Sequence, residues 1–132
     1  MNATLQLLAL TVMRVGAGLM MATHGFGKIF EDGRMEKFTA GVGDMGFPVP
    51  GLFAWLAALS ELVGGVCLAL GLGTRVSAFL IAGTMFVAAF IRHGADPFAK
   101  KELALLYLVV MVYFAVCGGG RWALDKVRGK KS

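Results

Sequence analysis

The stretch FAWLAALSELVGGVCLALGL, residues 53–72, decides the fold class, because it is long enough to cross a bilayer and carries a single charge. About 20 apolar residues span a hydrocarbon core at ~1.5 Å per helical residue. A charge at the bilayer centre costs roughly 3 kcal/mol even on a lenient insertion scale, so Glu61 is expected to face protein and find a partner. Small residues at helical spacing from Glu61, among them Gly64 and Gly65, leave one helix face almost without bulk. We therefore predict a membrane helix with a tightly packed, charged face.

A second apolar stretch, residues 5–24, carries Arg14 on a face that also holds Gly18. Counting along the helix places Arg14 about 15 Å inside the end of its span, and Glu61 a similar distance inside the start of its own. We predict that Arg14 and Glu61 form a buried ion pair at a close helix–helix contact. Such a pair is either a structural staple that sets the helix register or part of a functional site, and both interpretations stay open.

The composition indicates one small membrane domain. Of the 132 residues, 58% are hydrophobic, which is more apolar sequence than a soluble domain of this size can bury. We predict an all-α fold, a membrane-spanning four-helix bundle formed by a single domain of residues 1–132. The expected spans are residues 5–24, 53–72, 75–92 and 102–118, followed by a basic tail at 121–132.

The net charge of +5 is better explained by a membrane surface than by nucleic acid. The basic residues of the tail directly follow an apolar span and include Trp122, which suits anionic lipid headgroups, while Asp125 can neutralise a neighbouring arginine. With four spans, six Lys and Arg residues lie on each side of the membrane. The basic residues of the tail form the more compact cluster, and clusters of this kind favour the cytoplasmic side. We therefore expect a bacterial inner-membrane protein with both termini in the cytoplasm.

The two histidines, His24 and His93, each close a span that runs in the same direction, so both are expected at the same membrane face. With Lys28 nearby, they form a candidate ligand and proton-transfer site for a quinone, although an interfacial histidine can equally be a polar anchor. The spacing of His, Cys, Asp and Glu indicates no metal site and no intrinsic cofactor. Cys67 and Cys117 are expected near the same depth, as packing residues or as a redox dithiol.

Several strings in the chain resemble the DoxX family of small four-helix bacterial membrane proteins. They are RVGAGLMMATHGFGKIF at 14–30, GFPVP at 46–50, SELVGGVCLALGLGTR at 60–75, the region of His93, and GGGRWALD at 118–125. The resemblance implies functional or structural roles at ten positions: Arg14, His24, Gly25, Lys28, Glu61, Gly64, Gly65, His93, Trp122 and Asp125. It also implies a redox setting, since relatives are linked to quinol oxidation, to thiosulfate:quinone oxidoreduction and to complexes with oxidative-stress enzymes.

From these observations we expect a protein that supports membrane redox chemistry through contact with a quinone or with redox-enzyme partners; whether it is itself an enzyme stays open. The rival hypotheses are a non-enzymatic scaffold or assembly partner, and a path for a small solute or protons along the buried polar groups. The apolar outer faces also leave room for a homo-oligomer.

Overall fold

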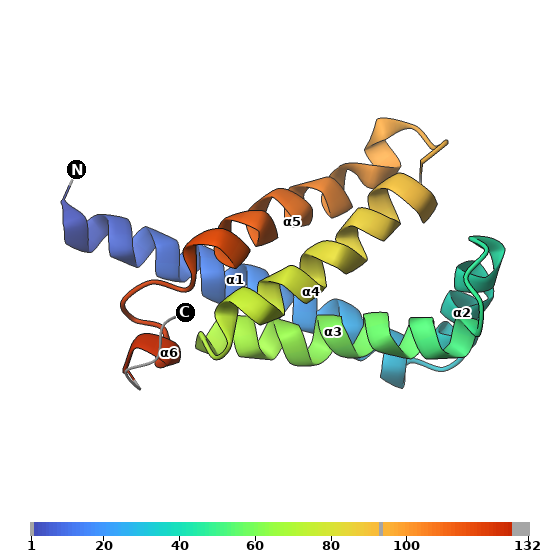
Figure 1. The fold of residues 1–132 in the computed structure, drawn as a ribbon, viewed down its shortest axis with the longest axis horizontal. Helices are drawn as coiled ribbons and strands as arrows, with labels where there is room; N and C mark the ends of the chain where they lie inside the picture. Colours follow the sequence, from blue (N-terminus) through green and yellow to red (C-terminus); the bar gives the residue numbers. More distant parts are fainter. Residues whose placement is uncertain (1, 93, 128–132) are drawn as a thin grey trace.

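The computed structural model describes residues 2–92 and 94–127, and all regular structure in these ranges is helical (Figure 1). The elements are α1 (Ala3–Phe30), α2 (Arg34–Asp44), α3 (Pro50–Leu70), α4 (Thr74–Val87) continuing into the π-helical turn η1 (Ala88–Arg92), α5 (Phe98–Cys117) and the short α6 (Leu124–Val127). The predicted all-α fold class is confirmed.

Local sequence explains where the main helices begin and end. The side chain of Asn2 accepts a 2.7 Å hydrogen bond from the backbone N–H of Thr4 and so caps α1. Pro50 opens α3, where its missing N–H costs nothing. Gly71 ends α3 in the left-handed region at φ 77°, and the N–H of Leu72 closes the turn on the carbonyl of Cys67 at 2.8 Å.

A helix covers most of each predicted span, but α1 continues six residues past His24 to Phe30. The helix continues through Gly25 and Gly27, and both glycines are buried against other parts of the protein. A Cβ atom at Gly25 would clash with the backbone of Leu62 in α3, so glycine here permits the two helices to approach closely. The extension carries Lys28 into the helical part of the chain.

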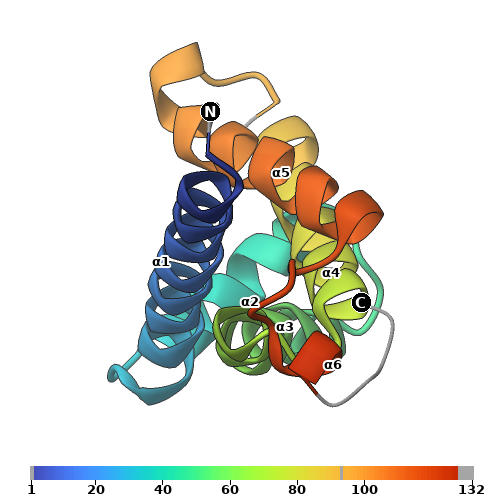
Figure 2. The same ribbon diagram turned by 90° about the vertical axis from the view of Figure 1, so that its left-hand side faces the viewer.

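The four long helices form a bundle with two close pairs (Figure 1). Helices α1 and α3 pack along each other, α4 packs on α3, and α5 packs mainly on α4. Turning the view by 90° shows α5 crossing above α4, with α1 to one side and α6 beside the turn that joins α3 to α4 (Figure 2). Helix α2 lies across the opposite end of the bundle, where it contacts α3 and α1.

By length and composition, three stretches among the described residues are apolar enough to cross a membrane: Ala3–Phe30, Pro50–Leu70 and Thr74–Arg92. The fourth predicted span corresponds to α5, a helix of 20 residues. Its first turns carry Lys100, Lys101 and Glu102, which leaves 15 apolar residues, about 22 Å of helix. Helix α5 therefore has a shorter apolar length than the other three.

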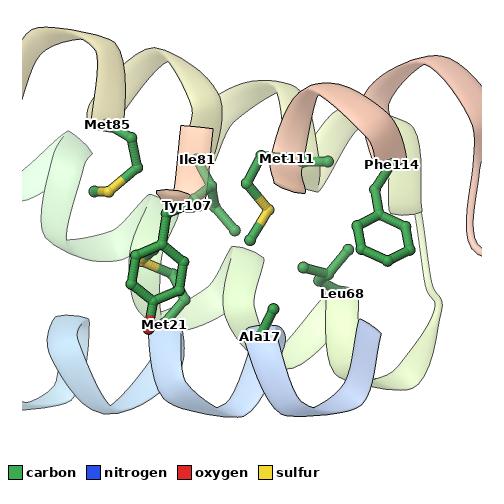
Figure 3. Packing of buried hydrophobic residues seen from close by; sticks show 9 residues of the cluster. Ala17, Met21, Leu68, Ile81, Met85, Tyr107, Met111 and Phe114 are labelled. Atoms are coloured by element: carbon green, nitrogen blue, oxygen red, sulfur yellow. The ribbon is translucent and has the colours of Figure 1, made fainter. Parts of the chain in front are cut away.

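The interior of the bundle is a cluster of hydrophobic side chains from all four long helices (Figure 3). Met21, Leu68, Ile81, Met111 and Phe114 are fully buried at its centre. By contrast, many large hydrophobic residues point outward, as expected where lipid rather than water covers the protein.

The contact between α1 and α3 depends on glycines that face each other. A Cβ atom at Gly18 would lie 2.6 Å from the carbonyl oxygen of Gly65, and one at Gly65 would lie 2.6 Å from that of Gly18. Gly64 faces the other neighbour, where a Cβ would meet Ile81 of α4 at 3.4 Å. These three glycines, singled out in the sequence, thus lie at helix–helix contacts of the kind that small residues permit in membranes.

Candidate functional site

The guanidinium of Arg14 is buried at the end of the bundle that holds the chain's C-terminal segment. Its Nη1 donates to the carbonyl oxygens of Leu68 at 3.0 Å and Ala69 at 2.6 Å, and its Nε donates to that of Gly119 at 3.1 Å. Leu68 and Ala69 lie in the last turn of α3, whose carbonyls lack partners within the helix. Arg14 therefore caps α3 and joins it to the segment that follows α5.

Asp125 completes this end of the molecule from the same C-terminal segment. Its carboxylate accepts hydrogen bonds from the backbone N–H groups of Gly73 at 2.9 Å and Thr74 at 3.1 Å, so it caps the N-terminus of α4 from a distant part of the chain. Its own N–H donates to the carbonyl of Gly71 at 3.0 Å. Asp125 is buried, whereas Trp122 is 47% exposed, and its role as an interfacial anchor stays a prediction.

Glu61 bonds to Lys28, not to Arg14. The ammonium of Lys28 lies 2.8 Å from Oε1 and 2.7 Å from Oε2 of Glu61, and the glutamate side chain is 1% exposed. The same ammonium lies 4.3 Å above the ring centroid of Phe38 in α2, a cation–π contact. The buried charge predicted at Glu61 is therefore compensated by a cation at the end of α1.

This geometry corrects the predicted pair of Arg14 and Glu61. The glycine contacts set the register of the antiparallel helices, since Gly18 lies against Ala69 and Gly25 against Leu62. In that register Glu61 is level with the end of α1 near Lys28, about 12 residues, or ~18 Å, from Arg14. The depth estimate was wrong because α1 continues beyond His24.

A cavity of about 490 Å³ lies beside this ion pair, between α2, α3 and α4 with its η1 turn. The polar side chains of its wall are those of Lys28, Ser60, Glu61, Thr84 and Arg92, and the rest is mainly apolar. Helix α2 covers it with residues that include Phe38 and Val42, whereas α3 and α4 form its sides. Helix α2 thus covers the cavity.

His24 lies elsewhere, at the contact between α1 and α5. Its ring meets the ring of Tyr107 edge to face, with centroids 5.8 Å apart, and it is not part of the cavity wall. His93 lies outside the described residues, so its predicted association with His24 stays a prediction. Cys67 and Cys117 are both free thiols.

Three residues were not identified from the sequence as contributors to a site, two at the cavity and one beside His24. Phe38 and Gly41 belong to α2, whose position over the cavity depends on tertiary packing rather than on any motif. Tyr107 is the hydroxyl-bearing residue in the apolar run LALLYLVV, and that isolated polar atom was the available signal.

The arrangement can bind an apolar molecule that carries a polar head. The cavity volume is in the range of small-molecule sites, which combine apolar walls with a few converging polar groups. Lys28 can donate hydrogen bonds or a proton, and the carboxylate of Glu61, which is 1% exposed, can accept one. Arg14 and Asp125 have a different role, because their bonds hold backbone groups of the protein itself.

Comparison with known proteins agrees with this architecture. The DoxX family model matches residues 9–94. A Haemophilus influenzae protein named only as uncharacterized is 36% identical over 129 residues, which is 92% of each chain. The putative oxidoreductase CatD of Bacillus subtilis is 32% identical over 92% of this chain and 89% of its own, and the inner membrane protein YqjF of Escherichia coli is 27% identical over 91% and 92%. No solved structure matches significantly. The chain belongs to the DoxX family of membrane proteins.

Proposed function

We propose that this protein supports redox chemistry in a bacterial inner membrane by binding a quinone or quinol in the cavity between α2, α3 and α4. The observation that carries the proposal is a largely apolar cavity of about 490 Å³ with the Lys28–Glu61 ion pair in its wall. A quinone ring needs an apolar slot for its body and a group within hydrogen-bond reach that can exchange a proton with its oxygen.

The name of one relative supports a redox setting, and the name of another supports the membrane location. One is a putative oxidoreductase and another an inner membrane protein. Applied to this chain, the second name favours a bacterial inner membrane. Within this proposal we also place both termini in the cytoplasm, on the strength of the compact basic tail, and count α5 as a fourth span. A redox enzyme docked on the protein would supply or remove the electrons, and the cavity would hold the quinone that exchanges them.

Purified protein in nanodiscs tests the proposal through a variant that fills the cavity. Gly83 lines it, and no neighbouring atom lies within 4 Å of a Cβ built there, so Gly83→Leu should block the site without disturbing the fold. Gly16→Leu is the matched control, because the space around Gly16 in α1 is equally open and lies outside the cavity. Decylubiquinone should bind the wild type and Gly16→Leu, and bind Gly83→Leu at least ten-fold more weakly. Equal binding to all three proteins, or to none, would refute the proposal.

A scaffold without a ligand is the second candidate, and the C-terminal end of the bundle favours it. There, the side chains of Arg14 and Asp125 form hydrogen bonds with backbone groups of α3, α4 and the segment after α5, which is a structural role. A path for protons or solutes has less support, because Met21, Ile81 and other fully buried apolar side chains fill the interior between Arg14 and Glu61.

A further inference from the structure

The cavity has a second cation, the exposed residue Arg92, which forms no ion pair within the described part of the chain. Arg92 ends the η1 turn and lines the cavity on the side of α2. Among residues 2–92 and 94–127, no carboxylate oxygen lies within 4.0 Å of its guanidinium. Lys28, by contrast, is neutralised by both oxygens of Glu61. The polar end of the cavity therefore has a net charge of about +1.

Helix α2 is shaped to hold that guanidinium at the cavity. A Cβ atom built at Gly41 would collide with Nη1 of Arg92, so the guanidinium lies directly against the backbone of α2. Gly41 itself is buried, and both residues belong to the cavity wall. The absence of a side chain at this position thus leaves the room that Arg92 occupies.

The opposite side of the cavity opens toward lipid. Leu56 of α3 and Phe79 and Leu80 of α4 line it and are 52%, 69% and 48% exposed. Large apolar side chains with this exposure on membrane helices face hydrocarbon, so an occupant can enter from the bilayer and leave its tail there. The cavity therefore joins an apolar entrance to a cationic end.

We propose that this cavity selects an amphipathic anion, a quinone-type ring with an ionised hydroxyl, whose negative oxygen pairs with Arg92 while its alkyl tail lies along Phe79 and Leu80. This inference rests on the proposed function and specifies the charge of the ligand that the same site takes. Arg92 is the residue that determines specificity, because a guanidinium presents two parallel donors to a charged oxygen and discriminates against a neutral ring. The Lys28–Glu61 pair adds no net charge, and the ammonium of Lys28 makes two hydrogen bonds to Glu61, which leaves its third N–H as a donor to the ligand.

A matched pair of ligands tests the selection. The probe 2-hydroxy-3-undecyl-1,4-naphthoquinone is an ionised vinylogous acid at pH 8, and its 2-methoxy ether has the same ring and tail but cannot ionise. Binding of both would be measured to the full-length protein in phosphatidylcholine nanodiscs. We expect the acid to bind the wild type about ten-fold more tightly than the ether, as a charge-assisted hydrogen bond provides.

Variants identify the source of the preference. Arg92→Gln should weaken the binding of the acid about ten-fold and leave the affinity for the ether unchanged. Arg92→Lys should retain part of the preference for the acid. Gly41→Ala, which displaces the guanidinium, should act in the same direction. Arg121→Gln is the control, because this exposed arginine lies between α5 and α6, is not part of the cavity wall and should change neither affinity.

The outcomes separate this inference from the proposed function. Equal affinities for acid and ether in the wild type, or an acid preference that survives Arg92→Gln, would overturn the inference while leaving quinone binding intact. If the acid binds and decylubiquinone does not, the selection of an anion is supported and the proposal that the cavity binds neutral quinones is wrong. If neither ligand binds, both the inference and the proposed function are wrong. If phosphatidylglycerol in the nanodiscs displaces the acid from the wild type, a lipid phosphate occupies Arg92 and the assignment to a quinone-type anion is wrong.

Discussion

At the scale of single residues, the carboxylate of Glu61 is a buried charge that needs a compensating cation. It is 1% exposed, and Lys28 bonds both of its oxygens. Removing one partner of a buried ion pair leaves the other charge without compensation, which costs about 3–5 kcal/mol. The pair is therefore expected to matter for folding as well as for any ligand chemistry.

Lys28→Ala should lower the free energy of unfolding by about 3 kcal/mol, and Glu61→Ala should have a similar effect. The double variant should lose less than the sum of the two, because neither charge is then left unpaired. Thermal or denaturant unfolding in detergent measures this, with Lys37→Ala as control, since Lys37 is exposed on α2. Strictly additive losses would show that the two side chains do not interact.

Arg14 holds the C-terminal segment to the bundle through its bond to Gly119. In Arg14→Met the carbonyls of Leu68, Ala69 and Gly119 lose their donor, so the segment should open more readily. Trypsin should then cleave after Arg121 roughly ten-fold faster, as a local loss of ~1–2 kcal/mol implies. Arg34→Met, which removes an exposed ion pair with Glu31, should leave this rate unchanged. An unaltered rate in Arg14→Met would mean that other contacts hold the segment.

At the scale of elements, the close packing of α1 on α3 sets the register that brings Lys28 to Glu61. Gly18→Ala should destabilise the protein by about 1–3 kcal/mol, because its Cβ would lie 2.6 Å from backbone atoms of α3 that cannot move independently. Gly16→Ala, two residues away in the same helix, meets no atom within 4 Å and should be neutral or stabilising. Comparing the melting temperatures checks this. Equal stability of the two variants would exclude the backbone contact.

Hydrophobic patterning predicted the helices, and the small residues predicted the close contact of α1 with α3, but the predicted partner of Glu61 was wrong. The long apolar runs around Glu61 and Arg14 were sufficient to place helices, because length and composition determine what spans a bilayer. The partner of Glu61 was not predictable by counting along the chain, since the register depends on which glycines face each other and on the continuation of α1 through Gly25 and Gly27. The cavity was missed because the position of α2 over it is a property of tertiary packing.

At the scale of the whole molecule, the number of times the chain crosses the membrane depends on α5. If all four long helices span the membrane, position 37 after α1 and position 121 after α5 lie on opposite sides. Cysteines introduced at Lys37 and Arg121, in a background with Cys67 and Cys117 replaced, should be labelled by an impermeant maleimide from opposite faces of sealed vesicles. Labelling from the same face would mean that α5, with its shorter apolar length, does not cross.

The central claim is that the cavity between α2, α3 and α4 is a quinone site, and photoaffinity labelling tests it most directly. An azido-quinone with an alkyl tail, irradiated with the protein in nanodiscs and mapped by mass spectrometry, should attach to residues of the cavity wall, such as Phe53, Phe79 and Met85. Excess decylubiquinone should prevent this labelling, and Gly83→Leu should abolish it. Labelling spread over the lipid-facing surface, or concentrated beside His24 and Tyr107 and unaffected by Gly83→Leu, would contradict the account.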